Sequence, residues 1–254
     1  MRAGKLVGGL KDESVRWALA IKVLEKELIN LMGNTILAAG YISYVGTFTQ
    51  SYRNSMLKRW MGFMKEKGIP FAYDFTATTG LGDPVKIREW GIKGLPADQL
   101  STENGILTTQ TKRWPLMIDP QSQANKWIKN MEKANGLTTF KMSNTKMAQY
   151  ISMSIKNGKP VLLENIEEIL DPMLEPLLQK NIVKYQGSNC IKFGEDFLPF
   201  SPDFKFFMTT KLSNPHYLPE ICIKVCLINF TVTPDGLEDQ LLVEVVKCEQ
   251  PEIE

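Results

Sequence analysis

The residues with the clearest chemical potential lie in the stretch RWPLMIDPQSQANKWIKNME, at positions 113–132. It begins as a short apolar run, turns at Asp119-Pro120 and continues with helical periodicity. That layout is typical of a phosphate-binding loop, which reads G-x-x-x-x-G-K-[S/T]. Its glycines let backbone N–H groups close around phosphates, its lysine reaches the outer phosphates and its hydroxyl holds Mg²⁺. This chain has the layout without those residues.

Alignment by spacing shows what has replaced the motif. A carboxylate at the first glycine position would repel a phosphate about 4 Å away by about 4 kcal/mol at an effective dielectric constant near 20. Alanine at the second glycine position, where the loop needs positive φ, adds about 1 kcal/mol. We therefore expect nucleotide binding to be weakened by roughly three to four orders of magnitude. The degenerate loop consists of Asp119 (first glycine), Gln121, Ser122, Ala124 (second glycine), Asn125 (lysine) and Lys126 (hydroxyl).

Two further strand ends could complete a nucleotide site. Phosphate-loop enzymes hold Mg²⁺ with an acidic residue at the end of an apolar strand, often followed by a glutamate that activates water. Here VLLEN ends in Glu164-Asn165, which keeps one carboxylate but offers no general base. After FFMTT, Lys211 and Asn214 could approach a γ-phosphate. Solvated loop positions are the simpler interpretation of Glu164 and Lys211.

The stretch LPEICIKVCLINF, which follows, contains no arginine that could stabilise phosphoryl transfer in a neighbouring subunit. The single histidine, His216, lies among turn residues and is a poor candidate for hydrolase chemistry. The four cysteines have no C-x-x-C spacing, so we expect no metal site. Cys222 and Cys226 are predicted to form a buried thiol pair on one strand face.

Composition limits the classes of partner. Hydrophobic residues make up 43% of the 254 residues and charged residues 23%, which is typical of a folded domain. A net charge of +2 without a basic block indicates no nucleic-acid or lipid-surface partner. Apolar runs are far shorter than the ~20 residues of a membrane span, and the first residues lack a signal-peptide core. We expect a soluble, intracellular protein.

The elements that position these residues alternate in type. Short apolar runs predict strands at WPLMI, LTTFKM, KPVLLEN, FKFFMTT and ICIKVCLINF. Helical stretches separate them, among them SNTKMAQYISMSIKNG, with Ser143 as expected N-cap, and DPMLEPLLQK. This alternation predicts an α/β fold with a parallel sheet flanked by helices. Within it, Trp114, Trp127 and Ile128 are expected to pack in the core or at an interface.

The first 70 residues predict a helical lead-in. Its first helix, at 12–33, ends at Gly33 and carries apolar residues spaced by four and three, which indicates packing against another helix. A buried helix at TILAAGYISYVG and a third helix from Gln50 to Lys67, capped by Thr49, follow. The spaced residues are Trp17, Ile21, Leu24, Leu28 and Leu31, and the third helix is expected to bury Tyr52, Met56, Trp60 and Phe63.

Three local expectations cover residues 71–110, and one covers the end of the chain. FAYDFTATTGLGD is predicted to be irregular, Asp83 to cap a helix with Pro84 in its first turn, and Ser101 to cap a further helix. An amphipathic helix after Thr233-Pro234, with Leu237, Leu241 and Val245 on its apolar face, is predicted to stop near Pro251.

Five long motifs, in order, carry a resemblance to a known family. REWGIKGLPADQLSTENGI, RWPLMIDPQSQANKWIKNME, GKPVLLENIEEILDPMLEPLLQK, TTKLSNPHYLPE and INFTVTPDGLEDQLL resemble the fifth AAA+ module of dynein heavy chains. The lead-in DESVRWALAIKVLEKELINLMGNTILAAGYISYVGTFTQSYR is similar to the segment after the returning helix of the dynein stalk. The wording RWPLMIDPQ, QANKWIKNME and TTKLSNPHY is more similar to axonemal than to cytoplasmic dyneins.

The resemblance implies an architecture and a role. Residues 1–70 would follow the stalk coiled coil, and residues 71–254 would form a large AAA+ subdomain with a five-stranded parallel sheet, ending where the small subdomain starts. The module would be structural, with no cofactor of its own, while other modules of the parent chain bind ATP and Mg²⁺. It would relay conformational change between those modules and the microtubule-binding stalk of a minus-end-directed motor.

Partners and location follow from the same resemblance. They are the neighbouring AAA+ modules, the stalk helices and, through the parent chain, microtubules and dynein intermediate and light chains, in the cytoplasm, the cytoskeleton and the axoneme of cilia or flagella. Trp17, Ile21, Leu24 and Leu28 would pack between stalk and ring, or alternatively within the domain. The alternative functions are a nucleotide-binding module with an atypical loop, using Lys126 or Lys211, and a free-standing interaction protein.

Overall fold

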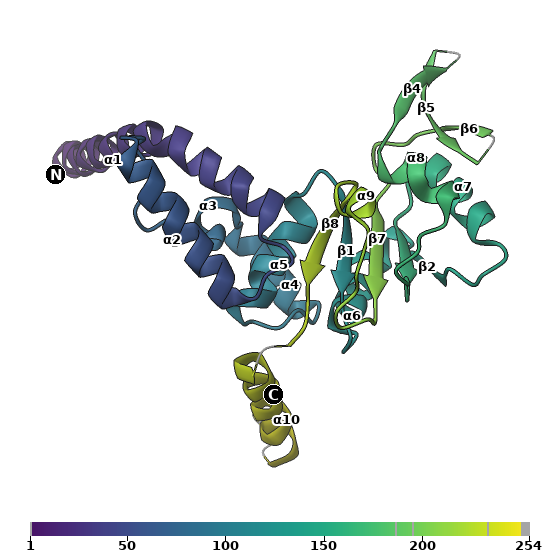
Figure 1. Cartoon of the computed structure of the whole chain (residues 1–254). Coiled ribbons are helices and arrows are strands. Elements are labelled where there is room, and N and C mark those ends of the chain that lie inside the picture. The colour runs from purple at the N-terminus through teal and green to yellow at the C-terminus, as the bar shows by residue number, and fades with distance from the viewer. Residues whose placement is uncertain (1, 186, 195, 233, 250–254) are drawn as a thin grey trace.

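The structure is a computed structural model that describes residues 2–185, 187–194, 196–232 and 234–249 (Figure 1). Its centre is a five-stranded parallel sheet in the order β2-β3-β7-β1-β8. The strand β1 pairs with β7 through Leu116 and Met208 and with the edge strand β8 through Leu116 and Leu227. The predicted α/β fold is confirmed. The strands are β1 (Trp114–Ile118), β2 (Thr138–Lys141), β3 (Val161–Glu164), β7 (Phe206–Thr210) and β8 (Val225–Asn229).

Both faces of this sheet are covered. Successive side chains along each strand point to opposite faces of the sheet. The side chains on one face belong to one core cluster, and those on the other face belong to a second. One face packs on the N-terminal helices and on α6 (Gln123–Glu132), through Trp127 and Ile128. The other packs on α7 (Met147–Asn157), η2 (Pro172–Leu174) and α8 (Glu175–Leu178). A short η1 (Lys133–Asn135) follows α6. Burial on both faces explains why the strands are continuous apolar runs.

The N-terminal helix is longer than predicted. α1 runs without interruption from Arg2 to Tyr44, so the expected end at Gly33 and the separate following helix are wrong. Gly33 serves close packing instead: a Cβ there would lie 2.2 Å from the Pro70 carbonyl oxygen. Among the side chains of α1 that the structure describes, those in the core lie in its C-terminal part, Leu37 and Tyr41, and Val45 follows directly after the helix.

α2 (Gln50–Glu66) begins after Thr49 as predicted, although the Thr49 side chain makes no capping hydrogen bond. Its buried residues are Arg53, Leu57 and Met64, with Met56 and Trp60 packed beside them. Tyr52 and Phe63 are exposed, so the buried face of α2 is rotated by about a third of a turn from the predicted face. The prediction of this face failed because Arg53 lies within the buried face, and a hydrophobic pattern does not count an arginine as a core residue.

The capping residues of α3, α5 and α7 explain where these helices differ from the predicted ones. α3 (Ala77–Leu81) forms inside the stretch predicted to be irregular, because Thr76 and Thr79 make a reciprocal capping box. α4 (Pro84–Ile92) is capped by Asp83 as predicted. α5 (Gln99–Gln110) begins after Asp98, whose carboxylate accepts the N–H of Ser101, so Ser101 is not the cap. α7 begins after Lys146 rather than after Ser143.

A second, three-stranded antiparallel sheet was not predicted. β4 (Ile182–Tyr185), β5 (Ser188–Phe193) and β6 (Asp196–Pro199) project beyond α8 (Figure 1). Cys222 ends the short helix α9 (Pro219–Cys222), so the predicted face shared with Cys226 on one strand is wrong. All four cysteines are free thiols.

α10 (Pro234–Glu249) lies apart from the sheet (Figure 1), and the predicted apolar positions Leu237, Leu241 and Val245 are exposed. Thr233 and the predicted stop near Pro251 lie outside the described residues. Within the described ranges, no helix combines the length and hydropathy that a membrane span requires.

Candidate functional site

The turn between β1 and α6 is occupied by its own carboxylate. Asp119 is 1% exposed, and its Oδ1 accepts the backbone N–H of Gln123 at 2.8 Å. Its Oδ2 accepts the N–H of Asn125 at 2.9 Å. These are the N-terminal amides of α6, the groups that hold phosphate in a working loop. The Asp119 side chain therefore takes the place of an anionic ligand.

The electrostatics of Asp119 combine two opposing effects. Burial raises the pKa of this carboxyl, while hydrogen bonds from Asn125, Gln123 and Ala124 act in the opposite direction. Burial is the larger effect, so the pKa lies above its ordinary value of 3.8. The amides of α6 thus offset part, but not all, of the cost of removing this carboxyl from water.

Glu164, at the end of β3, is also occupied by neighbours. Its Oε1 accepts the Asn125 amide at 2.7 Å and lies 2.6 Å from the Lys129 ammonium. Burial alone would raise the pKa of Glu164, but the hydrogen bonds from Lys129 and Asn125 outweigh it and hold this pKa below its ordinary value. Asn125, which the sequence alignment assigns to the lysine position, is therefore bonded directly to Glu164, which it assigns to the metal position.

The structure brings some of the other predicted residues to this turn. Ser122 has a φ of 62°, the left-handed conformation, and makes no capping bond with its side chain. Ala124 is fully buried, whereas Gln121 and Lys126 are exposed. Asn165 follows Glu164 with a φ of 55°. A small cavity lined by Gln123 and residues of α5 has a volume of about 10 Å³, which is room for about one water.

Lys211 and Asn214 follow β7 on the exposed loop that the sequence predicts. The more ordered feature at this strand end is Thr210, which is fully buried and donates its hydroxyl to the Ile166 carbonyl at 2.6 Å. The loops after β3 and β7 are thereby tied to each other. Among the described residues, no group of three His, Cys, Asp or Glu side chains could hold a metal ion.

The tryptophans of the opening stretch are core residues. Trp127 is fully buried and meets Trp90 edge-to-face at a centroid distance of 6.0 Å. Trp114 donates its indole N–H to the Leu177 carbonyl at 2.7 Å and carries the Lys180 ammonium 3.7 Å above its ring. The predicted packing role is confirmed for both.

A buried polar network that the sequence did not indicate links the N-terminal helices to the sheet. Arg53, fully buried, lies 3.5 Å from the Glu103 carboxylate and donates to the Gly46 carbonyl at 2.9 Å and to Asn104 at 2.7 Å. Tyr41 of α1 donates to Glu103. Asn104 donates to the carbonyl of Asn229, at the end of β8, at 2.7 Å. No local sequence pattern signals this network, because Arg53 and Glu103 lie far apart in the chain.

Sequence comparison decides the family. Residues 88–254 match the family described as ATP-binding dynein motor region, and residues 1–64 match the family described as microtubule-binding stalk of dynein motor. The chain belongs to the dynein heavy-chain family. It is 49% identical to dynein axonemal heavy chain 6 of Homo sapiens over 254 residues and to dynein axonemal heavy chain 1 of Homo sapiens over 253. It is 48% identical to dynein axonemal heavy chain 3 of Mus musculus.

Each of these matches covers the whole of this chain but 6% of the length of the relative. The stalk-family match coincides with α1 and most of α2, and the motor-region match contains the whole parallel sheet. The helical segment and the α/β segment thus match different parts of dynein heavy chains.

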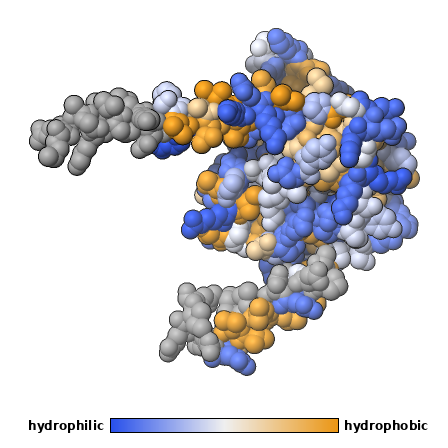
Figure 2. All heavy atoms as spheres, turned by 90° about the vertical axis from the view of Figure 1, so that its left-hand side faces the viewer, coloured by the Kyte–Doolittle hydropathy of each residue, from blue (hydrophilic) through white to orange (hydrophobic). Residues whose placement is uncertain are grey.

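The apolar stripe of α1 faces away from the rest of the described chain. Trp17 is 69% exposed and Leu28 is 70% exposed, with Ile21 and Leu24 above one half. In Figure 2 this part of α1 is an arm on which apolar side chains gather. Within the described residues, therefore, this stripe does not pack against the rest of the chain.

Proposed function

We propose that the chain is a structural, non-hydrolysing ring module of an axonemal dynein heavy chain, which relays conformational change between the ATPase modules and the microtubule-binding stalk. Residues 71–254 would be the large subdomain of the fifth AAA+ module. Residues 1–70 would lead into it from the stalk. The observation that carries this proposal is the Asp119 carboxylate on the N-terminal amides of α6.

An anion tethered within the loop competes with any free phosphate. The Asp119 carboxylate bonds the amides of Gln123 and Asn125 without loss of translational freedom, so a nucleotide would have to expel it before binding. The expelled carboxylate would then lie next to the phosphate, which is a like-charge contact. Both effects oppose nucleotide binding at this turn.

The groups that hydrolysis would need, a general base and a free metal-binding carboxylate, are also missing at this turn. Asn165 stands where a general base would be needed, and an amide does not accept a proton at neutral pH. Glu164 is engaged by Asn125 and Lys129, so a metal ion would have to displace an ammonium from it. These contacts support a module without a cofactor of its own.

The relay follows from how α1 is joined to the sheet. The connection that follows α1 bonds to the end of β8, because the Asn229 N–H donates to the Gly46 carbonyl at 2.8 Å. Arg53 donates to the same carbonyl and, through Asn104, reaches the Asn229 carbonyl. A displacement of the stalk-like helix would therefore be passed to the edge strand of the sheet as one body.

The partners and the location that we propose are based on the names of the relatives. The relatives are named axonemal heavy chains, so we place the parent protein in the axoneme of cilia or flagella. There it would act in a minus-end-directed, ATP-driven motor, with the neighbouring AAA+ modules, the stalk helices, microtubules and the intermediate and light chains as partners. The exposed stripe of Trp17, Ile21, Leu24 and Leu28 would contact stalk helices.

A second candidate is a nucleotide-binding module with an atypical loop, which the description "ATP-binding dynein motor region" favours. Calorimetric titration of the chain with ATP and Mg²⁺ separates the two. The structural proposal predicts no binding at 1 mM ATP, roughly three orders of magnitude weaker than a micromolar site. Micromolar affinity, with hydrolysis abolished by Glu164→Gln, would establish the second candidate. Lys156→Glu, on the surface of α7, serves as a charge-changing control.

A further inference from the structure

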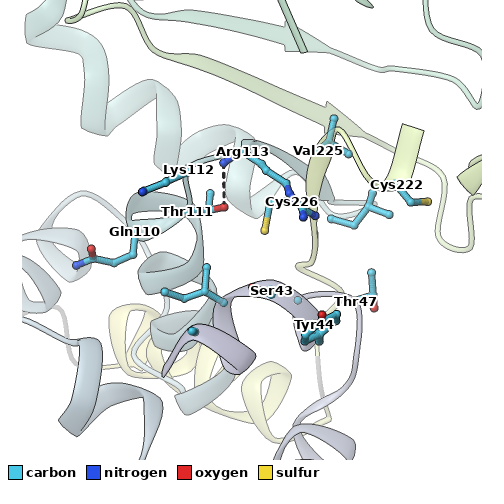
Figure 3. Close-up of a pocket in the computed structure, with 14 residues that line it drawn as sticks. Ser43, Tyr44, Thr47, Gln110, Thr111, Lys112, Arg113, Cys222, Val225 and Cys226 are labelled. Carbon is cyan, nitrogen blue, oxygen red and sulfur yellow. Dashed lines mark hydrogen bonds between the residues drawn. The ribbon is translucent and has the colours of Figure 1, made fainter. Parts of the chain in front are cut away.

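Two grooves on the described part of the chain carry opposite charge. The first lies between the last turns of α1 and the edge strand β8, has a volume of about 560 Å³ and is lined by Lys112 and Arg113 without any carboxylate (Figure 3). Gly46 covers the strand edge in this groove. A Cβ on Gly46 would lie 2.2 Å from the Leu227 carbonyl oxygen, and the Gly46 carbonyl accepts the Asn229 N–H. An occupant of this first groove therefore finds no continuous strand edge to pair with.

The second groove lies between the loop that follows β3 and the segment that contains α9. Its volume is about 400 Å³, within the range of sites that bind ligands or partner side chains. Two polar contacts join its walls. The Glu168 carboxylate accepts the His216 N–H at 2.7 Å, and the Lys224 ammonium lies 2.5 Å from the Glu175 carboxylate. The two walls are therefore tied to each other without a bound partner.

The second groove is largely apolar. Leu170, Leu178 and Ile221 line it and also pack against the core cluster under the sheet. Two further lining residues project into solvent, because Ile169 is 82% exposed and Leu218 is 63% exposed. Single exposed aliphatic residues are ordinary, but these two come from opposite walls of one groove. An apolar partner surface would remove both side chains from water.

The charge of the second groove is negative. Four carboxylates and one ammonium line it, on a chain whose net charge is +2. Glu175 pairs with Lys224, whereas Glu220 takes part in no ion pair among the described residues. A partner that carries arginine or lysine beside its apolar residues would complement this groove.

The walls of the second groove are loops and short helical turns, so they offer no strand edge. In α9 the N–H groups of Ile221 and Cys222 both donate to the Leu218 carbonyl. Pro172 and Pro219, which begin the helical turns of the two walls, have no N–H. A polypeptide that binds here must therefore satisfy its own backbone hydrogen bonds, as a helix does.

We propose that the second groove receives a short basic amphipathic helix of a partner protein. Two aliphatic side chains of that helix, three or four positions apart, would contact Ile169 and Leu218. An arginine or lysine on the same face would pair with Glu220. This interaction goes beyond the relay proposed above and does not depend on it.

The test is a selection from a display library of helical peptides, each about three turns long and randomised on one face. The library is depleted on the double variant Ile169→Ser/Glu220→Lys and then selected on the wild-type chain. Enriched peptides should carry aliphatic residues at helical spacing with arginine or lysine beside them. A fluorescent copy of one such peptide should bind saturably, and glutamates in place of its basic residues should weaken binding about tenfold or more.

Two single variants separate the apolar part of the recognition from the charged part. Ile169→Ser and Glu220→Lys should each weaken peptide binding about tenfold. The matched controls lie on α4, outside the groove: Ile92→Ser, at a residue that is 80% exposed, and Glu89→Lys. Both controls should leave binding unchanged, and all four variants should unfold at the wild-type Tm because these side chains are exposed.

Four results would overturn the proposal. They are the absence of enriched peptides, enrichment of acidic peptides, equal peptide affinity of the wild-type chain and both groove variants, and dimerisation of the chain that Ile169→Ser abolishes. The last result would make a second copy of the chain the occupant. None of these readouts depends on whether nucleotide binds at Asp119.

Discussion

Replacing Asp119 by alanine is the most informative perturbation of the turn between β1 and α6. The change leaves the amides of Gln123 and Asn125 without their acceptor, in a place where the side chain is 1% exposed. A buried donor without a partner costs about 1–3 kcal/mol, so two of them cost roughly 2–6 kcal/mol. Removing a carboxyl whose pKa is raised by burial returns part of this. We expect a net loss of about 3 kcal/mol in the free energy of unfolding.

The assay is thermal and urea denaturation of the chain. For a domain of this size, about 3 kcal/mol corresponds to a fall of roughly 6–12 °C in Tm. Asp83→Ala is the matched control, because Asp83 caps α4 through one N–H at 3.0 Å and is exposed. It should lose about 1 kcal/mol.

An anion should rescue the Asp119→Ala variant specifically. With the carboxylate gone, the amides of α6 form an open anion site, and sulfate at about ten times its Kd would restore about 1.4 kcal/mol. The wild-type chain, at matched ionic strength, should show no such excess. A loss below about 0.5 kcal/mol, or equal sulfate responses in variant and wild type, would refute the assignment of Asp119 as a built-in anion.

Three more predictions concern residues with other roles. Because the pKa of Glu164 is lowered below 4.5 in the fold, its stabilisation is present above that pH and is lost as pH falls through the lower folded value. Glu164→Gln should therefore cost about 1–2 kcal/mol at pH 7 in urea unfolding, and this cost should shrink progressively as pH is lowered below 4.5. Gly33→Ala would place a Cβ 2.2 Å from the Pro70 carbonyl oxygen and should cost about 3 kcal/mol of unfolding free energy. Gly62→Ala, with open space around it, should stabilise the chain by about 0.5–1 kcal/mol. A calorimetric Tm that is higher for Gly33→Ala than for Gly62→Ala would contradict this. Trp17→Glu should change the unfolding free energy by less than about 0.5 kcal/mol, because Trp17 is 69% exposed, and a larger loss would mean that it packs within the chain.

The parallel sheet could be predicted because strands that are buried on both faces appear in the sequence as short apolar runs. All five predicted strands exist, but β8 starts later than ICIKVCLINF suggests. Pro219 begins a helical turn there, since proline is well suited to the first helical position. The antiparallel sheet was missed although its signals were present. Gly187 and Gly194, both at positive φ, lie at its two turns.

Gly33 shows why the helix end could not be read from the sequence. Glycine after a periodic apolar run usually marks a C-cap, and a local pattern cannot reveal that Pro70 will lie against the helix at that point. Arg53 shows a related limit. Its burial depends on Glu103, which is 50 positions away in the chain, so no local periodicity predicts it.

The absence of the glycines and the lysine of a phosphate loop at 119–126 could be read from the sequence, but the contacts that fill this turn could be read only in part. Lys129 lies four positions after Asn125, on the same face of α6, so both side chains can reach Glu164 at the end of β3. That spacing was a usable signal. The conformation of Asp119 was not, because a carboxylate before a helix either caps it or points to solvent, and the surrounding burial decides which.

A carboxylate within the loop has a further consequence for a motor module. In a working phosphate loop the anion on the helix amides arrives and leaves with the nucleotide, so the loop has two states. Asp119 is part of the chain, and in this structure Glu164 is bonded to Asn125. Under the proposed function, a turn held in this one state would not be a source of conformational change. It can still pass one on, because the buried contacts of Arg53 join α1 to β8. The proposed relay between ATPase modules and a stalk would use this combination of an occupied turn and a helical segment anchored at the sheet edge.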